Sequence, residues 1–247
     1  MSWYHISPVL ETAAVYAAKS AFWEIKTPAA AVFRLIIAPV MNTPPATPPV
    51  LVAGLGNPGA TYAQTRHNAG FWLIDALADN WGMTWRGEKK FHGDITGSEC
   101  RLLRPMTMMN NSGRAVAAVC NYFRIPPQQV LVAHDEADLP PGEVKLKFGG
   151  GNAGHNGLAD ISHALGSRDY WRLRLGVGRV PGDIANYVLA NAPTSEKQAV
   201  DDAIKRVLEL WPHINNGDWQ TAMQLLHTSE KDNDLGKDNS PEKDNAS

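Results

Sequence analysis

The segment Val50-Leu51-Val52-Ala53 is a short, continuously apolar run, and the turn Gly54-Leu-Gly-Asn-Pro-Gly59 follows it directly. Such a run is typical of a strand that is buried on both faces of a parallel sheet. Residues 129–134 have the same character. Strands and helices alternate along the chain in the order βαββαββαβααα. This order predicts an α/β fold: a single-domain three-layer sandwich with a mixed, mostly parallel twisted sheet flanked by helices.

Apolar periodicity, turns and capping patterns place the other elements. We expect helices over 68–81, 112–123, 156–165, 184–190 and 218–227, a hairpin of strands 90–96 and 99–104, and strands over 144–148 and 171–177. Asp183 is expected to cap the helix that follows it. Ser195 and Gln198 have the spacing of a capping box, so a long helix is expected to open there and to end at Trp211, before Pro212.

Composition excludes several classes of protein. The chain has 247 residues, of which 44% are hydrophobic and 19% are charged, and its formal net charge is −2. This apolar fraction excludes a disordered chain, and two cysteines exclude a disulfide scaffold. No run of about 18 apolar residues predicts a membrane span. The low cysteine content fits a cytoplasmic protein.

The two ends of the chain differ from its centre. Residues 1–49 contain the proline-rich stretch 42–49 and lack the early basic residues of a secretory signal. We expect them to be a disordered extension, or to lie upstream of a true start at Met41; an added targeting segment is the alternative. Residues 229–247 are expected to form a disordered polar tail that carries the net charge. Residues 50–228 are expected to form the one folded domain.

The turn at 54–59 matches the pattern G-x-G-x-x-G, which in some folds binds a dinucleotide pyrophosphate. Two features argue against that function here. The residues after the turn, 61–67, are polar and without helical periodicity, and no acidic residue follows at the end of a second strand. We therefore favour a tight turn in which Pro58 fixes φ and Gly59 takes a conformation that favours glycine.

Polar residues recur where strands end and helices begin. In open α/β sheets, ligands bind at the carboxyl ends of the strands, so these side chains are expected to converge there: Asn57, His67, Asn110, Asp135 and Asn156. For any single asparagine taken alone, a helix N-cap is the favoured role. As a set, they suit hydrolysis. An imidazole accepts a proton from water, a carboxylate orients the imidazole, and carboxamides donate to a developing oxyanion.

Other catalytic patterns are missing from the sequence. There is no G-x-S-x-G elbow and no H-E-x-x-H, and the cysteines are not in C-x-x-C spacing. No histidine spacing selects a metal ion. Direct attack by water, without a cofactor or a metal, is therefore the expected chemistry.

Four long motifs, in order, resemble those of the bacterial peptidyl-tRNA hydrolase family. They are Gly54–Gly59 with Tyr62–Gly70, Pro105–Gly113, Val132–Gly142 and Gly149–Leu158. The resemblance covers about residues 50–228. It implies cleavage of the ester between a peptide and the 3′ ribose of tRNA, by a metal-independent, monomeric enzyme.

The resemblance also implies roles for individual residues. His67 corresponds to the base that activates water, and Asp135 to its partner. The peptide and the terminal adenosine would be positioned by Asn57, Asn110 and Asn156, in a cleft walled by Tyr62, Met109 and His155. Lys147 and Arg174 correspond to the contacts with tRNA phosphate, although two solvated strand ends would have the same pattern. Neighbouring cations are expected to widen this basic patch: Arg104, Lys145, Arg168 and Arg172.

One departure from the family pattern lies in the glycine loop. Many relatives have His-Gly where this chain has Asn152-Ala153, and the alanine is expected to stiffen the loop slightly. Two other functions stay open at this point. The first is a non-enzymatic RNA-binding relative, which would not need His67, Asp135 and the three asparagines. The second is a nucleotide-binding oxidoreductase, which would bind a dinucleotide.

Overall fold

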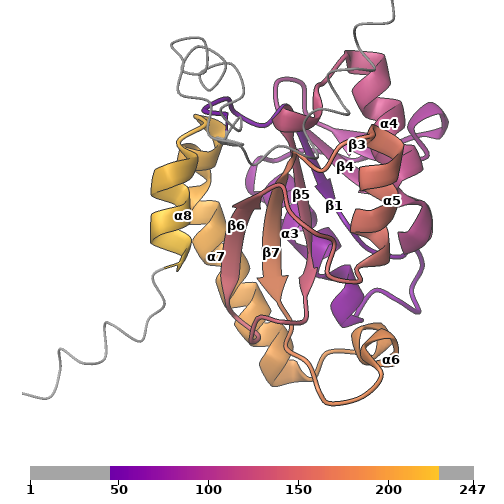
Figure 1. Cartoon of the computed structure of the whole chain (residues 1–247), viewed down its shortest axis with the longest axis vertical. Coiled ribbons are helices and arrows are strands. Elements are labelled where there is room, and N and C mark those ends of the chain that lie inside the picture. Colours follow the sequence, from indigo (N-terminus) through magenta and orange to yellow (C-terminus); the bar gives the residue numbers. More distant parts are fainter. Residues whose placement is uncertain (1–44, 228–247) are drawn as a thin grey trace, which may run out of the picture. The chain divides into compact units, whose positions relative to one another are not determined.

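The computed structural model describes residues 45–227. Seven strands form one sheet in the order β2-β3-β4-β1-β5-β7-β6 (Figure 1). Their bounds are β1 Leu51–Gly54, β2 Arg86–Glu88, β3 Gly93–Thr96, β4 Arg101–Pro105, β5 Val130–Glu136, β6 Val144–Phe148 and β7 Trp171–Gly176. The four central strands are parallel, and the pairs β2–β3, β3–β4 and β6–β7 are antiparallel. The predicted mixed sheet is confirmed, with its parallel part confined to the centre.

Helices cover both faces of this sheet, as the sequence predicts (Figure 1). They are α3 Ala69–Asn80, α4 Ser112–Phe123, α5 Asn156–Leu165, α6 Ile184–Leu189, α7 Thr194–Asn215 and α8 Trp219–His227, with short 3-10 turns η1 Arg66–Asn68, η2 Lys89–Phe91, η3 Met109–Asn111 and η4 Pro127–Gln129. One apolar core joins α3, α7 and α8 to the sheet, and a second joins α4 and α5 to the opposite face. No helix within residues 45–227 is long and apolar enough to cross a membrane.

The long helix α7 departs from the prediction at both ends. It begins at Thr194 after Pro193, and the predicted Ser195–Gln198 capping box is wrong because no side chain caps this helix. Pro212 does not end it; the helix continues to Asn215. A proline removes only one helical N–H, and the buried side chains of Trp211 and Ile214 hold the last turn in the core. Strand β2 is a further element that the sequence pattern did not predict, since its three residues Arg-Gly-Glu have no apolar side chain.

The glycines of the first turn serve packing between β1 and α3. A Cβ on Gly54 would lie 2.3 Å from the carbonyl oxygen of Gly70, and one on Gly56 would lie 2.6 Å from the ring of Phe71. Helix α3 begins ten residues after Gly59, which has a φ of 103°. The turn therefore lets a strand and a helix approach closely, as the tight-turn interpretation predicts, and it does not open a helix as a dinucleotide-binding turn does.

The described structure begins before the predicted domain boundary. Thr47 accepts a hydrogen bond from the indole N–H of Trp219 (2.9 Å), and Gly217 lies directly against the backbone of Ala46 and Thr47. These residues, which the composition assigns to the N-terminal extension, therefore pack on the α7–α8 turn. The rest of that extension, the proposed start at Met41 and the polar tail lie outside the described residues.

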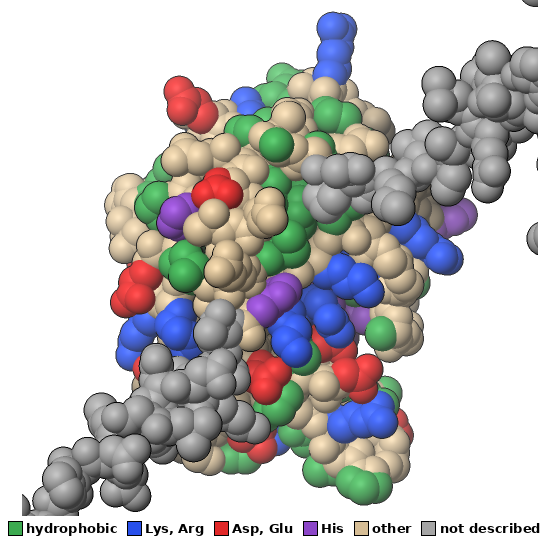
Figure 2. Space-filling model, turned by 60° about the vertical axis from the view of Figure 1, so that its left-hand side comes forward, with side chains coloured by type: hydrophobic (Ala, Val, Ile, Leu, Met, Phe, Trp, Pro, Cys, Tyr) green, Lys and Arg blue, Asp and Glu red, His purple; other side chains and the backbone are tan. Residues whose placement is uncertain are grey.

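Among the described residues, no helix covers the face of β6 and β7 on the α5 side of the sheet. Trp171, Leu173 and Leu146 point into the α7–α8 core, so the alternating residues point the other way. The core beneath α4 and α5 contains no residue of β6 or β7. Figure 2, turned so that the α8 side comes forward, shows Lys and Arg side chains gathered in one area of the surface. Because no helix of residues 45–227 covers it, this open strip of sheet can hold polar side chains.

Candidate active site

A cavity of about 420 Å³ opens at the carboxyl ends of β1 and β5. Asp135 is the last residue but one of β5, His67 comes from η1 after β1, and His155 directly precedes α5. All eight residues expected in the catalytic and substrate sites line this cavity: Asn57, Tyr62, His67, Met109, Asn110, Asp135, His155 and Asn156. The structure thus brings together the residues that the sequence placed at the ends of separate elements.

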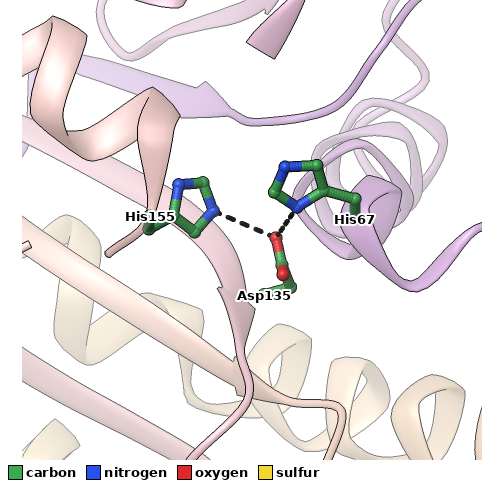
Figure 3. A group of neighbouring side chains, drawn as sticks. All are labelled: His67, Asp135 and His155. Atoms are coloured by element: carbon green, nitrogen blue, oxygen red, sulfur yellow. Dashed lines mark hydrogen bonds and ion pairs between the residues drawn. The ribbon is translucent and has the colours of Figure 1, made fainter. Parts of the chain in front are cut away.

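Two imidazoles meet at one oxygen of Asp135 (Figure 3). His67 Nδ1 lies 2.9 Å and His155 Nε2 lies 3.0 Å from Oδ1 of the carboxylate. Burial by itself would raise the pKa of Asp135, but the two imidazoles hold that pKa well below its usual range. The carboxylate is therefore ionised, and it fixes the proton of His67 on Nδ1.

The second ring nitrogen of His67, Nε2, has no hydrogen-bond partner within residues 45–227, and in Figure 3 it points away from Asp135. Burial lowers the pKa of His67, whereas the charge and the hydrogen bond of Asp135 raise it, and the net result is a pKa above the ordinary value of 6.5. His67 is thus an oriented base with its lone pair free.

His155 is held in the opposite tautomer. Its Nδ1 accepts the backbone N–H groups of Gly157 (3.1 Å) and Leu158 (3.4 Å), which makes it the N-cap of α5. A nitrogen that accepts N–H groups carries no proton, so the ring proton is on Nε2 and is donated to Asp135. His155 therefore positions the carboxylate and is tied down at both of its ring nitrogens.

The donor atoms of His67, Asp135 and His155 lie within 4.8 Å of one another, a spacing compatible with a metal ion. The hydrogen bonds do not fit one. A metal ligand must present a lone pair, and Nε2 of His155 carries the proton as long as Nδ1 caps α5. Binding a metal would break that cap. The expectation of a metal-independent site stays a prediction.

Hydrogen bonds hold both the side chain and the backbone of Asn57. Its Oδ1 accepts the N–H of Met109 (2.7 Å), which leaves the Nδ2 amide group without a partner among the described residues. Asn68 fixes the backbone of Asn57, accepting its N–H at 2.8 Å and donating to its carbonyl at 3.0 Å. The sequence placed Asn68 beside His67 but assigned it no role; the only signal was its place in the motif.

The N-cap alternative for the asparagines does not hold. Asn68 and Asn111 occupy N-cap positions, but neither side chain makes a capping hydrogen bond. Asn110 and Asn156 are exposed in the cavity wall. Oδ1 of Asn110 accepts the side-chain amide of Asn111 at 3.5 Å, whereas the Nδ2 group of Asn110 and the carboxamide of Asn156 have no partner among the described residues and can bind a ligand.

Lys147 and Arg174 both lie on the open strip of β6 and β7, where Lys147 is exposed and Arg174 is bonded to Glu136 at 2.9 Å. The prediction of a wider patch is wrong for two residues. Arg104 is paired with Asp75 and Asp94 next to α3. Arg172 is only 2% exposed and points beneath the glycine loop 149–154. Lys145 does lie on the strip, 3.7 Å from Glu143.

Arg66, which the sequence did not single out, holds one wall of the cavity. Its guanidinium is bonded to Glu196 on α7 at 2.8 Å, to the carbonyl of Tyr187 in α6, and to the carbonyls of Ala190 and Asn191 just after α6. Because Arg66 directly precedes His67, this network joins the base to the α6 segment that lines the cavity.

Fold and site together define a class: a hydrolytic enzyme that uses a histidine–aspartate pair in the cleft of an α/β domain. Comparison with known proteins specifies the family. Residues 51–234 match the family model described as Peptidyl-tRNA hydrolase. The chain belongs to the peptidyl-tRNA hydrolase family, as the sequence motifs indicated, and is a hydrolase.

Individual relatives are similar over most of their length. The peptidyl-tRNA hydrolase of Azoarcus sp. (strain BH72) is 50% identical over 188 residues, which cover 74% of this chain and 86% of that protein. That of Nitrosospira multiformis is 51% identical over 189 residues, 73% of this chain and 98% of that protein. The crystal structure of peptidyl-tRNA hydrolase from Acinetobacter baumannii has a TM-score of 0.71 at 42% identity and covers 73% of this chain and 95% of that one.

Proposed function

We propose that this chain releases tRNA from peptidyl-tRNA by direct attack of water on the ester at the 3′ ribose, with His67 as the general base. The observation that carries the proposal is the orientation of His67. Its Nδ1 is bonded to the ionised Asp135, and its Nε2 is free at the cavity. Water held at Nε2 loses a proton to the ring as it attacks the ester carbonyl, and Asp135 stabilises the imidazolium that forms.

The carboxamides supply the polar contacts that ester hydrolysis needs. Asn57 presents its Nδ2 amide group, because its oxygen is held by Met109. Such a donor stabilises the negative charge that develops on the ester oxygen. Asn110 and Asn156, exposed in the same wall, are proposed to bind the peptide and the terminal adenosine. Tyr62 and Met109 complete the walls of the cleft.

The open strip of β6 and β7 is proposed to contact tRNA phosphate through Lys147 and Arg174. The register pairs Lys145 with Arg174 and Lys147 with Arg172, so two pairs of like charges lie directly across the strands. Such pairs destabilise a sheet, and a polyanion beside them relieves the repulsion. A monomeric state and a cytoplasmic location follow from the family resemblance and are proposals too.

Purified full-length protein and N-acetyl-aminoacyl-tRNA, with and without a chelator, test the function. We expect ester cleavage that survives the chelator, and a loss in kcat of about 10²–10⁴-fold in His67→Ala. His163→Ala, an exposed histidine on α5 outside the cavity, is the matched control and should cleave like the wild type. Equal activity in His67→Ala would overturn the assignment of the base, and no cleavage by the wild type would overturn the function.

The domain organisation is also a proposal: residues 50–228 carry the activity, and translation starts at Met41. The intact mass of the native protein tests the start, since a mass that includes residues 1–40 contradicts it. A chain that begins at Pro45 keeps the contacts of Ala46 and Thr47 with the α7–α8 turn. We expect it to cleave the substrate at the rate of the full chain.

A further inference from the structure

Arg172 binds the glycine loop from beneath. Its guanidinium donates to the carbonyl oxygen of Gly151, to that of Gly150 at 2.9 Å and to Oδ1 of Asn152 at 3.3 Å. The side chain lies under the loop and over the ring of Tyr170, with 2% of the residue exposed. One buried cation therefore sets the direction of two successive peptide groups.

The N–H groups of these two peptide groups face outward. Every peptide bond within residues 45–227 is trans, and in a trans peptide the N–H points away from the C=O. With the carbonyls of Gly150 and Gly151 turned toward Arg172, the N–H groups of Gly151 and Asn152 point away from the sheet. Neither N–H group has an acceptor among the described residues. Successive outward N–H groups of this kind form a concavity that binds anions.

The charge beneath the loop lacks an acidic partner. Within residues 45–227, no carboxylate forms an ion pair with Arg172, whereas Arg66, Arg104, Arg174 and Arg179 each have at least one. Its Nε is buried without a hydrogen bond. Lys147 adds a second cation, because its ammonium lies 3.1 Å from the point where a Cβ on Gly150 would be. A buried cation without a carboxylate is costly unless an anion approaches it.

We propose that the outward amides of Gly151 and Asn152, with Arg172 behind them and Lys147 beside them, form a binding site for a phosphodiester of the RNA next to its 3′ end. The site rests on the proposed function and specifies where the substrate's backbone lies. The loop leads within a few residues into His155 and contributes Asn152 to the wall of the catalytic cavity. Arg172 is the positioning residue, since it acts on the phosphate through the loop.

Amide NMR of the ¹⁵N-labelled full chain tests this site directly. The trinucleotide CCA, which carries internal phosphodiesters but no ester-linked peptide, is titrated into the wild type, and inorganic phosphate is titrated separately. We expect saturable shifts of the Gly151 and Asn152 amide resonances with CCA. Shifts with inorganic phosphate alone, and none with CCA, would contradict a phosphodiester of the RNA as the ligand.

Arg172→Gln removes the charge and the fork of N–H donors. We expect its Kd for CCA, and its KM for N-acetyl-aminoacyl-tRNA, to rise about tenfold, with kcat changed less than threefold. Arg124→Gln, an equal charge change at the exposed end of α4, is the control and should leave both constants as in the wild type. If the wild type cleaves its substrate but CCA leaves both amide resonances unmoved, the site is overturned while the proposed function stands.

Discussion

Two buried arginines hold two walls of the same cavity, and they differ in one respect. Arg66 and Arg172 are 6% and 2% exposed, and each binds carbonyl oxygens of a segment whose neighbouring residues line the cavity. Arg66 also has the carboxylate of Glu196 at 2.8 Å, whereas Arg172 has no such partner among the described residues. Because Glu196 neutralises the charge of Arg66, this arginine stabilises the fold and does not attract an anionic ligand. The charge of Arg172 remains available to an anionic ligand. The comparison therefore separates a structural wall, the α6 segment held by Arg66, from a binding wall, the glycine loop 149–154 held by Arg172.

The two walls meet at Asp135, because His67 comes from the Arg66 side and His155 follows the glycine loop. Asp135→Asn breaks that connection and is expected to have the largest effect, a loss of about 10²–10⁴-fold in kcat. It also removes the charge that raises the pKa of His67, while the burial that lowers this pKa remains.

The pH profile of kcat/KM checks this prediction. His67 acts as a base only when unprotonated, so activity rises with pH through its pKa. In the wild type the midpoint of that rise should lie above 6.5, and in Asp135→Asn it should lie below the wild-type midpoint. An unchanged midpoint would show that the titrating group is not a His67 coupled to Asp135.

Substitution of Arg66 should lower the stability of the folded protein. Arg66→Met leaves Glu196 without its partner and removes the hydrogen bonds that the guanidinium donates to three carbonyls. We expect a loss of about 2–4 kcal/mol in the free energy of unfolding, measured with urea. Lys205→Met, which breaks an exposed ion pair on α7, is the matched control and should leave the urea midpoint in place. A loss no greater than that of the control would contradict the structural role of this wall.

Substitution of Arg172 should affect anion binding more than stability. Arg172→Met removes a buried charge that has no carboxylate partner among the described residues, so we expect it to lose less stability than Arg66→Met. Because a ligand that binds only the folded state stabilises it, inorganic phosphate at constant ionic strength should raise the Tm of the wild type and of Arg66→Met, and not of Arg172→Met. A Tm rise of equal size in all three would place the anion elsewhere.

Periodicity was sufficient to predict most of the fold. Strand β6 and helix α5 have the predicted bounds, since apolar spacing decides elements that face a core. The motifs placed the candidate site residues at one cavity, because the carboxyl ends of parallel strands share an edge. The roles of Arg66, Arg172 and Asn68 were not predictable. Each binds backbone groups of a distant loop, and backbone groups leave no pattern in a sequence.

Ala153 offers the finest test of the binding wall. It lies in the glycine loop with a φ of 47°, a left-handed conformation that costs an alanine about 1–2 kcal/mol relative to its ordinary regions. Ala153→Gly removes this strain but gives the unfolded chain more freedom, so the net gain in the free energy of unfolding should be at most about 1 kcal/mol. The substitution leaves the contacts of Arg172 with Gly150, Gly151 and Asn152 in place. If Arg172 fixes the loop, the KM of Ala153→Gly for N-acetyl-aminoacyl-tRNA should stay within about twofold of the wild-type value. A KM that rises as far as in Arg172→Gln would mean that the stiffness of the loop at Ala153, rather than Arg172, holds the amides in position.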